Sequence, residues 1–387
     1  MTCLVRRALW AALILQLLPS HARAQDDFYQ VGGYVKYLFS SSDLPSIGRV
    51  NDHLLHARLN TRLYFSRAVT AAAEIRNRIF YGGSVREIPD FLSTVRSDHD
   101  FGRADIVWWN ARSSLGYTEL DRLWIDGVYD NLQVTIGRQR IAWGTALVWN
   151  PTDLFNPLSV LDFDYEERPG VDAVHVQYFL SPVSKIEIAF KPGKTLARRI
   201  VAGKILLNRW NYDLHLIGGV QGTNPFVGGA WAGDIAGAGF RGEILARSIG
   251  EETDPRFDGA WSTSASLSAD YTFPSNTYIH AEALFNSRGV TEQAQLFLPE
   301  SRSLGLLSPA RWSLFQEVSF DLHPLVRVSG FIIYNPSDAS FVVVPTVTWS
   351  ASSQIDVSFV GLLFSGGTLT EYGGYGQSLF VRGKYSF

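Results

Sequence analysis

The chain has 387 residues, of which 46% are hydrophobic and 18% are charged, and its formal net charge is −3. This slightly acidic balance gives no support for nucleic-acid binding. The single cysteine, Cys3, lies near the N-terminus, ahead of the first apolar run, so the rest of the chain has neither a disulfide nor a thiol ligand for a metal.

The N-terminus has the features of a secretory signal. Arg6 and Arg7 precede an apolar run over residues 8–18, and small residues follow where a signal peptidase needs them. The run is too short to span a bilayer. We therefore expect residues 1–24 to be removed as a signal peptide and residues 25–387 to form one domain. Loss of the three leader arginines lowers the 34 basic residues to 31, against 37 acidic ones.

Beyond this leader, apolar and polar residues alternate as they do in strands with two different faces. In residues 52–65, Leu55, Leu59 and Leu63 alternate with polar side chains. Charges, Gly, Pro or Asn interrupt every apolar run within a few residues, so no membrane-spanning helix is expected. Because backbone groups in hydrocarbon are satisfied only in helices or closed sheets, the pattern predicts an all-β fold, a transmembrane antiparallel β-barrel.

Turn signals divide this domain into about 18 strands, with 16 as the alternative count. An even number places both termini on the same side of the membrane. Long loops are expected over 82–116, 142–170 and 289–310, and Gly237 lies either in a turn or in the middle of one long strand. The expected strands are at 29–39, 52–65, 69–79, 117–129, from 132, and at 171–180, 185–191, 199–208, 212–221, 226–235, 237–247, 259–273, 277–288, 311–320, 325–335, 341–350, 354–365 and 377–387.

The last nine residues form an amphipathic strand that ends on an aromatic residue. Val381, Tyr385 and Phe387 fall on one face, while Arg382 and Lys384 fall on the other. This strand resembles the closing strand of Gram-negative outer-membrane barrels. The resemblance implies an outer-membrane location, and it implies that the barrel assembly machinery recognises Tyr385 and Phe387.

A segment of different character follows the strand that starts at residue 132. Residues 136–156 have the sequence IGRQRIAWGTALVWNPTDLFN. Its two Asn-Pro steps predict an ordered loop, because proline cannot donate to a ladder and it restricts the residue before it. We expect the loop at 142–170 to fold into the barrel and narrow the lumen. The alternative is that this loop only braces the rim, with its carboxylates solvated outside.

Charged side chains are expected to line the lumen. Four arginines on two neighbouring strands point the same way and form an arginine ladder, at positions 58, 62, 76 and 78, and the carboxylates of the loop are expected to face it. Arg138 and Arg140 join them only if a bulge near Gly137 turns them inward. The candidate pore-lining residues are Arg58, Arg62, Glu74, Arg76, Arg78, Arg138, Arg140, Asp153, Asp162, Asp164, Glu166 and Glu167.

The step Gly137-Arg138-Gln139, followed by Trp143-Gly144, is similar to the corresponding step in porin-like outer-membrane families, including alginate-export-type barrels. The continuation Asn-Pro-Thr-Asp departs from the export barrels. The resemblance supports the porin-like class, and because a barrel of 16 to 18 strands leaves an aqueous lumen unless it is plugged, we expect a channel for passive diffusion of small hydrophilic solutes, with no cofactor. The alternatives are an export conduit for an anionic polysaccharide and a barrel scaffold that works with a periplasmic partner. Implied partners are outer-membrane lipid and lipopolysaccharide, the assembly machinery and further copies of the chain in a homo-oligomer.

Sequence motifs of catalysis and metal binding are missing. The chain has neither a GxSxG nucleophile elbow nor an HExxH pair. His53 and His56 are close in sequence, and we expect them to be a solvated pair. His280 and Glu282 share a strand face, and we expect them to be polar lining. An enzyme is therefore not expected.

Overall fold

The computed structural model describes residues 28–45, 47–97, 101–155, 161, 167, 169–250 and 260–387, so the expected signal peptide lies outside the described residues. Within this part no helix is both long and apolar enough to cross a membrane. The strands are β1 (Tyr29–Leu44), β2 (Gly48–Tyr64), β3 (Val69–Gly82), β4 (Asp105–Ala111), β5 (Ser114–Tyr129), β6 (Leu132–Gln139), β7 (Val171–Ser181), β8 (Ser184–Lys191), β9 (Ile200–Arg209), β10 (Tyr212–Gln221), β11 (Asn224–Ile235), β12 (Ala238–Ser248), β13 (Trp261–Thr272), β14 (Tyr278–Asn286), β15 (Trp312–His323), β16 (Val326–Asn335), β17 (Ser340–Ser350), β18 (Ile355–Ser365) and β19 (Ser378–Ser386). The helices are α2 (Gly83–Glu87), α3 (Phe91–Val95), η1 (Leu196–Arg198) and α4 (Leu298–Ser303).

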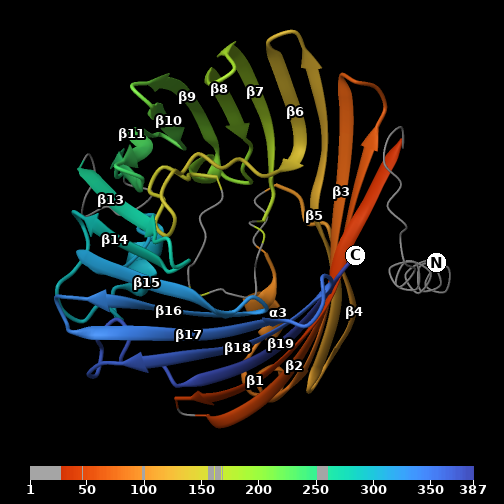
Figure 1. The fold of residues 1–387 in the computed structure, drawn as a ribbon, viewed down its shortest axis with the longest axis vertical. Helices are drawn as coiled ribbons and strands as arrows, with labels where there is room; N and C mark the ends of the chain where they lie inside the picture. The colour runs from red at the N-terminus through yellow and green to blue at the C-terminus, as the bar shows by residue number, and fades with distance from the viewer. Residues whose placement is uncertain are drawn as a thin grey trace.

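The strands form one antiparallel sheet that closes on itself (Figure 1). The first strand, β1, pairs with β2 on one edge and with β19 on the other. At this seam Gly33 and Phe387 exchange two backbone hydrogen bonds, of 2.9 and 3.0 Å. Closure removes the free edges of the sheet, so its backbone groups find partners without water.

The described residues hold 19 strands, of which 18 build the closed ring. One edge of β5 pairs with β3, and the other pairs with β4 over its first residues and with β6 over its last. β4 therefore extends the wall beyond the end of the short β6. The predicted 18-strand barrel is confirmed. The segment 82–116, expected to be a loop, contains α2, α3 and β4.

The uncertain region around Gly237 is a hairpin turn. Ile235 pairs with Ala238, and the two residues between them have positive φ angles, 53° at Ala236 and 85° at Gly237. Positive φ angles at both central residues are typical of the two-residue turns that join antiparallel strands, and glycine adopts such angles without steric cost. β11 and β12 are therefore two strands, as the 18-strand count requires.

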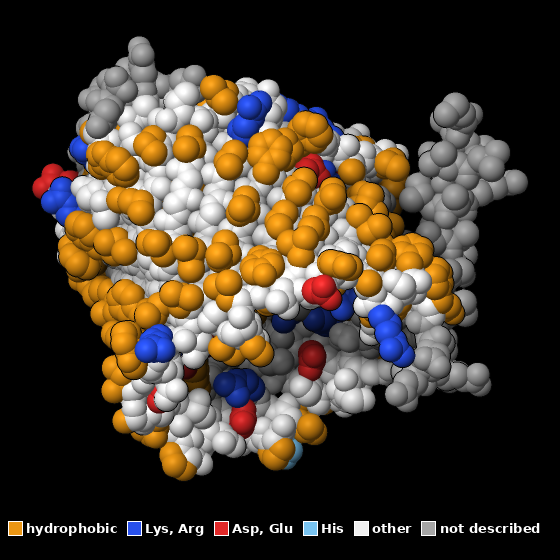
Figure 2. Space-filling view, turned by 90° about the horizontal axis from the view of Figure 1, so that it is seen from above, with side chains coloured by type: hydrophobic (Ala, Val, Ile, Leu, Met, Phe, Trp, Pro, Cys, Tyr) orange, Lys and Arg blue, Asp and Glu red, His pale blue; other side chains and the backbone are white. Residues whose placement is uncertain are grey.

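The outer face of the ring is apolar. On β13, Leu267, Ala269 and Tyr271 are exposed, whereas the serines between and before them, Ser266 and Ser268, point inward and are buried. Figure 2 shows one side of this wall. Hydrophobic side chains are spread across its middle among the backbone and other side chains without charge, and charged side chains lie mainly toward the edges. The alternation is the one expected of strands with lipid outside and water inside.

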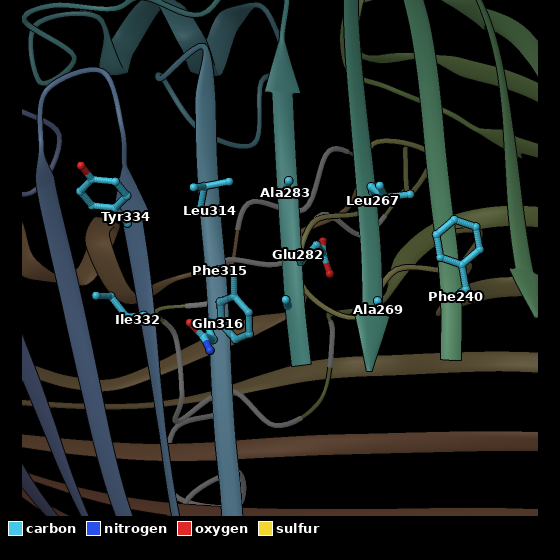
Figure 3. A pocket seen from close by; sticks show the side chains of 11 residues that line it. Phe240, Leu267, Ala269, Glu282, Ala283, Leu314, Phe315, Gln316, Ile332 and Tyr334 are labelled. Carbon is cyan, nitrogen blue, oxygen red and sulfur yellow. The ribbon is translucent and has the colours of Figure 1, made fainter. Parts of the chain in front are cut away.

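A hollow of about 580 Å³ interrupts this outer wall. Small side chains on β13 and β14, among them Ala269 and Ala283, lie between the larger Phe240 and Leu314 (Figure 3). The pairing register places Ala269 opposite Phe240 and Ala283 opposite Leu314, so all four belong to the outward rows of the sheet.

Two packed cores lie inside the ring, between the inner wall and the segment that joins β6 to β7. One cluster packs Trp143 and Phe155 of this segment against the inner wall of β7 to β12. A second packs Trp149 against Leu284, Phe315 and other apolar side chains of β14 to β18. The interior is therefore partly filled.

A buried carboxyl group joins three loops on the rim that carries the long connections. Glu371 lies between β18 and β19 and accepts hydrogen bonds from Ser308 Oγ (2.9 Å) and Asn335 Nδ2 (3.0 Å). Its backbone N–H donates to Asp338 (2.8 Å). Burial raises the pKa of the Glu371 carboxyl from 4.5 to about 7.

We predict that Gly33→Ala weakens closure of the ring. A Cβ on Gly33 would overlap the carbonyl oxygen of Arg58 and lie 3.2 Å from the Phe387 ring. Such overpacking costs about 1–3 kcal/mol, measurable by urea unfolding of the barrel in detergent. The control is Gly383→Ala on β19, because a Cβ there meets nothing within 4 Å. Equal effects of the two substitutions would contradict the prediction.

We also predict that the rim loops loosen as the pH rises. The carboxyl of Glu371 binds its proton more tightly when folded than its ordinary pKa of 4.5 allows. Its contribution to stability is therefore complete below about pH 4.5 and is lost as the pH rises through 7. Hydrogen exchange of residues 366–377 should speed up between pH 6 and 8 beyond the intrinsic rate. Glu371→Gln should abolish the change, whereas the exposed Glu292→Gln should preserve it.

Candidate functional site

The segment between β6 and β7 passes inside the ring (Figure 1). It leaves the sheet after Gln139, and none of its described residues lies in a strand before β7 starts at Val171. Gly144 allows its course, because a Cβ there would collide with the side chain of Asn150. We name residues 140–170 the internal loop. Without a ladder, its backbone N–H groups need other acceptors.

Glu243 on β12 supplies many of these acceptors. This carboxylate is 1% exposed and accepts from the N–H groups of Thr145, Ala146 (2.8 Å) and Thr152 (3.0 Å). The hydroxyls of Thr145 and Thr152 donate to it as well, at 3.2 and 2.7 Å. One side chain of the wall thus holds both ends of the turn at 145–152.

Two further glutamates hold the internal loop to the wall. Glu282 on β14 accepts from the N–H groups of Val148 (3.1 Å) and Trp149 (2.6 Å). Glu187 on β8 accepts from the indole N–H of Trp143 at 3.1 Å. Along the loop the acceptors thus come from β8, β12 and β14, and each is charged, which makes the hydrogen bonds strong.

Glu187 also collects basic side chains from its neighbours. His175 Nε2 lies 2.7 Å from one of its oxygens, and the ammonium groups of Lys185 and Lys204 lie 3.0 and 2.9 Å from the other. These partners offset the cost of burying the carboxylate.

The opposite wall holds the other end of the internal loop. Glu167 accepts from the hydroxyl of Tyr34 (3.0 Å), and its carboxylate lies 3.7 Å from the Arg58 guanidinium. Arg58 is 1% exposed and also pairs with Glu74 and, at 2.6 Å, with Asp121. The loop thus contacts Tyr34 on β1 and Arg58 on β2, and Arg58 is already paired with two carboxylates of the wall.

Two of the other three arginines of the ladder, Arg76 and Arg78, contact side chains of the neighbouring strands. Arg76 pairs with Glu119 at 2.6 Å, and Arg78 lies 3.6 Å from the same carboxylate. Arg78 also lies over the ring of Tyr117, 4.9 Å from its centroid. Arg62 is exposed on the inward face. The ladder is therefore largely neutralised by carboxylates of β3 and β5.

The structure describes two of the loop carboxylates that were expected to face this ladder, Asp153 and Glu167, and they lie in different places. Glu167 is the described loop carboxylate that reaches it, whereas Asp153 is 3% exposed and follows Thr152, which Glu243 holds on the other wall. Asp162, Asp164 and Glu166 lie outside the described residues.

Arg138 and Arg140 differ in their surroundings. Arg138 is 5% exposed and stands in register with Leu123 and Asp172. Its guanidinium donates to Asp172 at 3.0 Å and to the carbonyl oxygens of Leu120 (2.9 Å) and Gly102. Arg138 is therefore buried between β5 and β7 where β6 ends, and we leave it out of the proposed pore lining. Arg140 is exposed at the start of the internal loop.

The two anchor points of the internal loop lie on opposite sides of the ring. Arg58 is on β2 and Glu243 is on β12, and the strand order puts nine steps between these strands in either direction round the 18-strand ring. One loop thus contacts both ends of a diameter.

Several residues of this site were not among the sequence candidates. Glu119, Asp121, Glu187, Glu243 and Lys204 all lie on inward positions of strands. Their signal was present in the period-two pattern, since a charge on the inward face of a membrane strand lies in the lumen. What the pattern lacks is any sign that an inward glutamate binds a loop.

No group of three His, Cys, Asp or Glu side chains that could hold a metal ion occurs in the described ranges. His280 lies between Ser268, at 2.9 Å, and Glu282, at 3.4 Å. Since Glu282 holds the internal loop, this pair belongs to the loop's attachment.

Comparison with known proteins places the fold. No family model and no curated protein match the chain. Among solved structures, OccK5 (OpdH) of Pseudomonas aeruginosa is 7% identical with a TM-score of 0.59, over 93% of this chain and 98% of that chain. OccAB3 of Acinetobacter baumannii is 8% identical with a TM-score of 0.58, over 93% and 99%. OmpF of Salmonella typhi, in complex with daunomycin, is 11% identical with a TM-score of 0.50, over 93% and 97%. The chain has the fold of the porins of Gram-negative outer membranes.

Proposed function

We propose that the chain is an outer-membrane channel for passive diffusion of small hydrophilic solutes, narrowed by its internal loop. The observation that carries the proposal is the attachment of one loop to opposite walls, by Glu243 on β12 and by Arg58 on β2. A ring of this size leaves an aqueous lumen unless something fills it. A loop across the diameter reduces the passage without closing the barrel.

The apolar outer wall suits this location, with outer-membrane lipid and lipopolysaccharide around it. Tyr385 and Phe387, at the end of the chain, are the proposed signal for the barrel assembly machinery. A homo-oligomer remains part of the proposal.

The charge pattern favours weak selectivity. Arg58 and Arg76 are paired with carboxylates, so they add local dipoles more than net charge. Arg62 is exposed, and no ion pair joins it to another residue in the described part of the chain. An exposed cation in a pore attracts anions and repels cations.

Conductance of the purified protein in planar bilayers tests the proposal. Steady conductance with weak ion selectivity supports passive diffusion. A barrel that stays closed alone and conducts only with a periplasmic partner would favour the scaffold. A barrel that stays closed to small ions but passes an anionic polysaccharide would favour the export conduit.

We predict that Glu243→Gln increases conductance and current noise. The substitution replaces an acceptor of five hydrogen bonds by an amide with one acceptor oxygen, and each orphaned donor costs about 1–3 kcal/mol. The internal loop should then leave the β12 wall. The control is Glu317→Gln, a carboxylate on β15 whose side chain is 31% exposed. Unchanged traces for Glu243→Gln would show that the loop does not limit the current.

We predict that Arg62→Gln shifts permeability away from anions. In water, a unit charge about 8 Å from a passing ion contributes ~0.5 kcal/mol, favourable for an anion and unfavourable for a cation, so the anion to cation permeability ratio should fall roughly fivefold. Reversal potentials in a salt gradient measure this ratio. Arg67→Gln, in the exposed turn between β2 and β3, removes the same charge outside the strands and should have a smaller effect. Equal shifts in reversal potential for the two substitutions would show that Arg62 does not contribute to ion selectivity.

A further inference from the structure

Gln316 on β15 is a polar side chain on the apolar outer wall. It is exposed and stands in register with Ala281 of β14 and Ile332 of β16, on one outward row of the sheet. The outward side chains of β15 are Trp312, Leu314, Gln316, Val318 and Phe320, so Gln316 lies at the middle of an otherwise apolar series. At that height the wall of a membrane barrel meets hydrocarbon.

The side chains around Gln316 offer its amide no partner. Along β14 to β19, the other outward positions between the strand ends hold apolar or aromatic side chains, glycine or proline. No hydrogen bond joins the Gln316 amide to another residue in the described part of the chain. By contrast Asn77, which faces outward on β3, accepts from the hydroxyl of Thr118 at 2.7 Å.

An amide in hydrocarbon needs hydrogen-bond partners, because no water is present to replace them. An acyl chain offers neither a donor nor an acceptor. The partner of Gln316 is therefore expected to be a polar group of another molecule that lies against this wall.

Gln316 also lies at the hollow in the outer wall (Figure 3). The alanines of β13 and β14, among them Ala281 and Ala283, make the wall low on one side of β15. On the other side of β15, the larger Ile332 and Tyr334 border the hollow from β16. The wall thus has a depression on one side of Gln316 and a ridge on the other.

A second copy of the chain has both the polar group and the shape that this surface needs. Copies in one membrane stand the same way up, so two copies that share one surface are related by a two-fold axis along the membrane normal. A side chain on this axis meets its own equivalent, and two carboxamides can each donate an N–H to the oxygen of the other. Beside the axis, β16 of one copy faces β14 of the other, so Ile332 lies opposite the alanines of the hollow.

We propose that the outer face of β13 to β16 is a contact surface for a second copy of this chain, with the two Gln316 amides paired on the two-fold axis. This contact assigns a surface to the homo-oligomer of the proposed function and rests on that part of it, not on conduction. A single barrel that conducts would reject the contact and leave the channel. A paired barrel that does not conduct would reject the channel and leave the contact.

Photo-crosslinking in the outer membrane of Gram-negative cells tests the contact. The photoreactive p-benzoylphenylalanine replaces Leu314, which is outward and exposed and leaves the Gln316 amide in place. Irradiation should give an adduct with twice the mass of the chain, linked to a peptide from β13 to β16 of the second copy. The matched control places the same residue at Ile136 on β6, which is also exposed and lies nine strands from β15 in either direction round the ring.

Sedimentation of the purified protein in detergent measures the strength of the association. Gln316→Leu removes the amide pair and should weaken the dimer roughly tenfold. Ala283→Phe fills the hollow and should weaken the dimer at least as much. The control is Ala73→Phe, which adds the same ring to an outward alanine of β3 and should leave the association unchanged.

Several results would overturn the proposal. An adduct of two chains that is absent at position 314, or equally abundant at positions 314 and 136, would reject the contact. An adduct with lipid alone would show that an acyl chain occupies the hollow, and an adduct with a different protein would assign the surface to that protein. A dimer of equal strength in Gln316→Leu and the wild type would reject the amide pair.

Discussion

Every buried backbone polar group needs a hydrogen-bond partner, and this requirement shapes the molecule twice. The strands meet it by closing into a ring, where Gly33 and Phe387 complete the last ladder. The internal loop has no ladder, and it meets the requirement through charged side chains of the wall. Glu187, Glu243 and Glu282 are therefore as much a part of the loop's structure as its own residues are.

The buried charges follow from the same requirement. A carboxylate that accepts several N–H groups is well satisfied, but a guanidinium needs acceptors of its own. Arg58 finds them in Glu74, Asp121 and Glu167, and Arg76 finds one in Glu119. Such networks contribute little net stability compared with apolar packing, but they fix geometry, because any other arrangement leaves a charge unpaired. Complementary charges at defined positions therefore fix the side chains of the inner wall, and the internal loop packs against these side chains.

The sequence predicted the barrel well and the site only in part. Turn residues separate the strands and so determine their number. Period-two alternation determines which face of each strand meets lipid, because a shift by one residue would turn every lipid-facing side chain inward. The pairing of Arg58, Arg76 and Arg78 with Glu119 and Asp121 depends on which strands are neighbours and on a register shift within β5. Neither is visible in local periodicity. The expected opposition of loop carboxylates and arginines was likewise a guess about contacts between segments far apart in sequence, and only Glu167 meets it among the described residues. β4 was missed because its seven residues lie within a long connection and pair on one side only.

The attachment of the internal loop at both ends of a diameter has a mechanical consequence. A hollow cylinder under lateral pressure deforms most easily by becoming oval, and its sheet hydrogen bonds resist stretching better than bending. A strut fixed to β2 and β12 opposes flattening along one axis and leaves the perpendicular axis free. The cross-section of this barrel should therefore be stiffer in one direction than in the other, so that squeezing by the surrounding bilayer would alter its shape anisotropically.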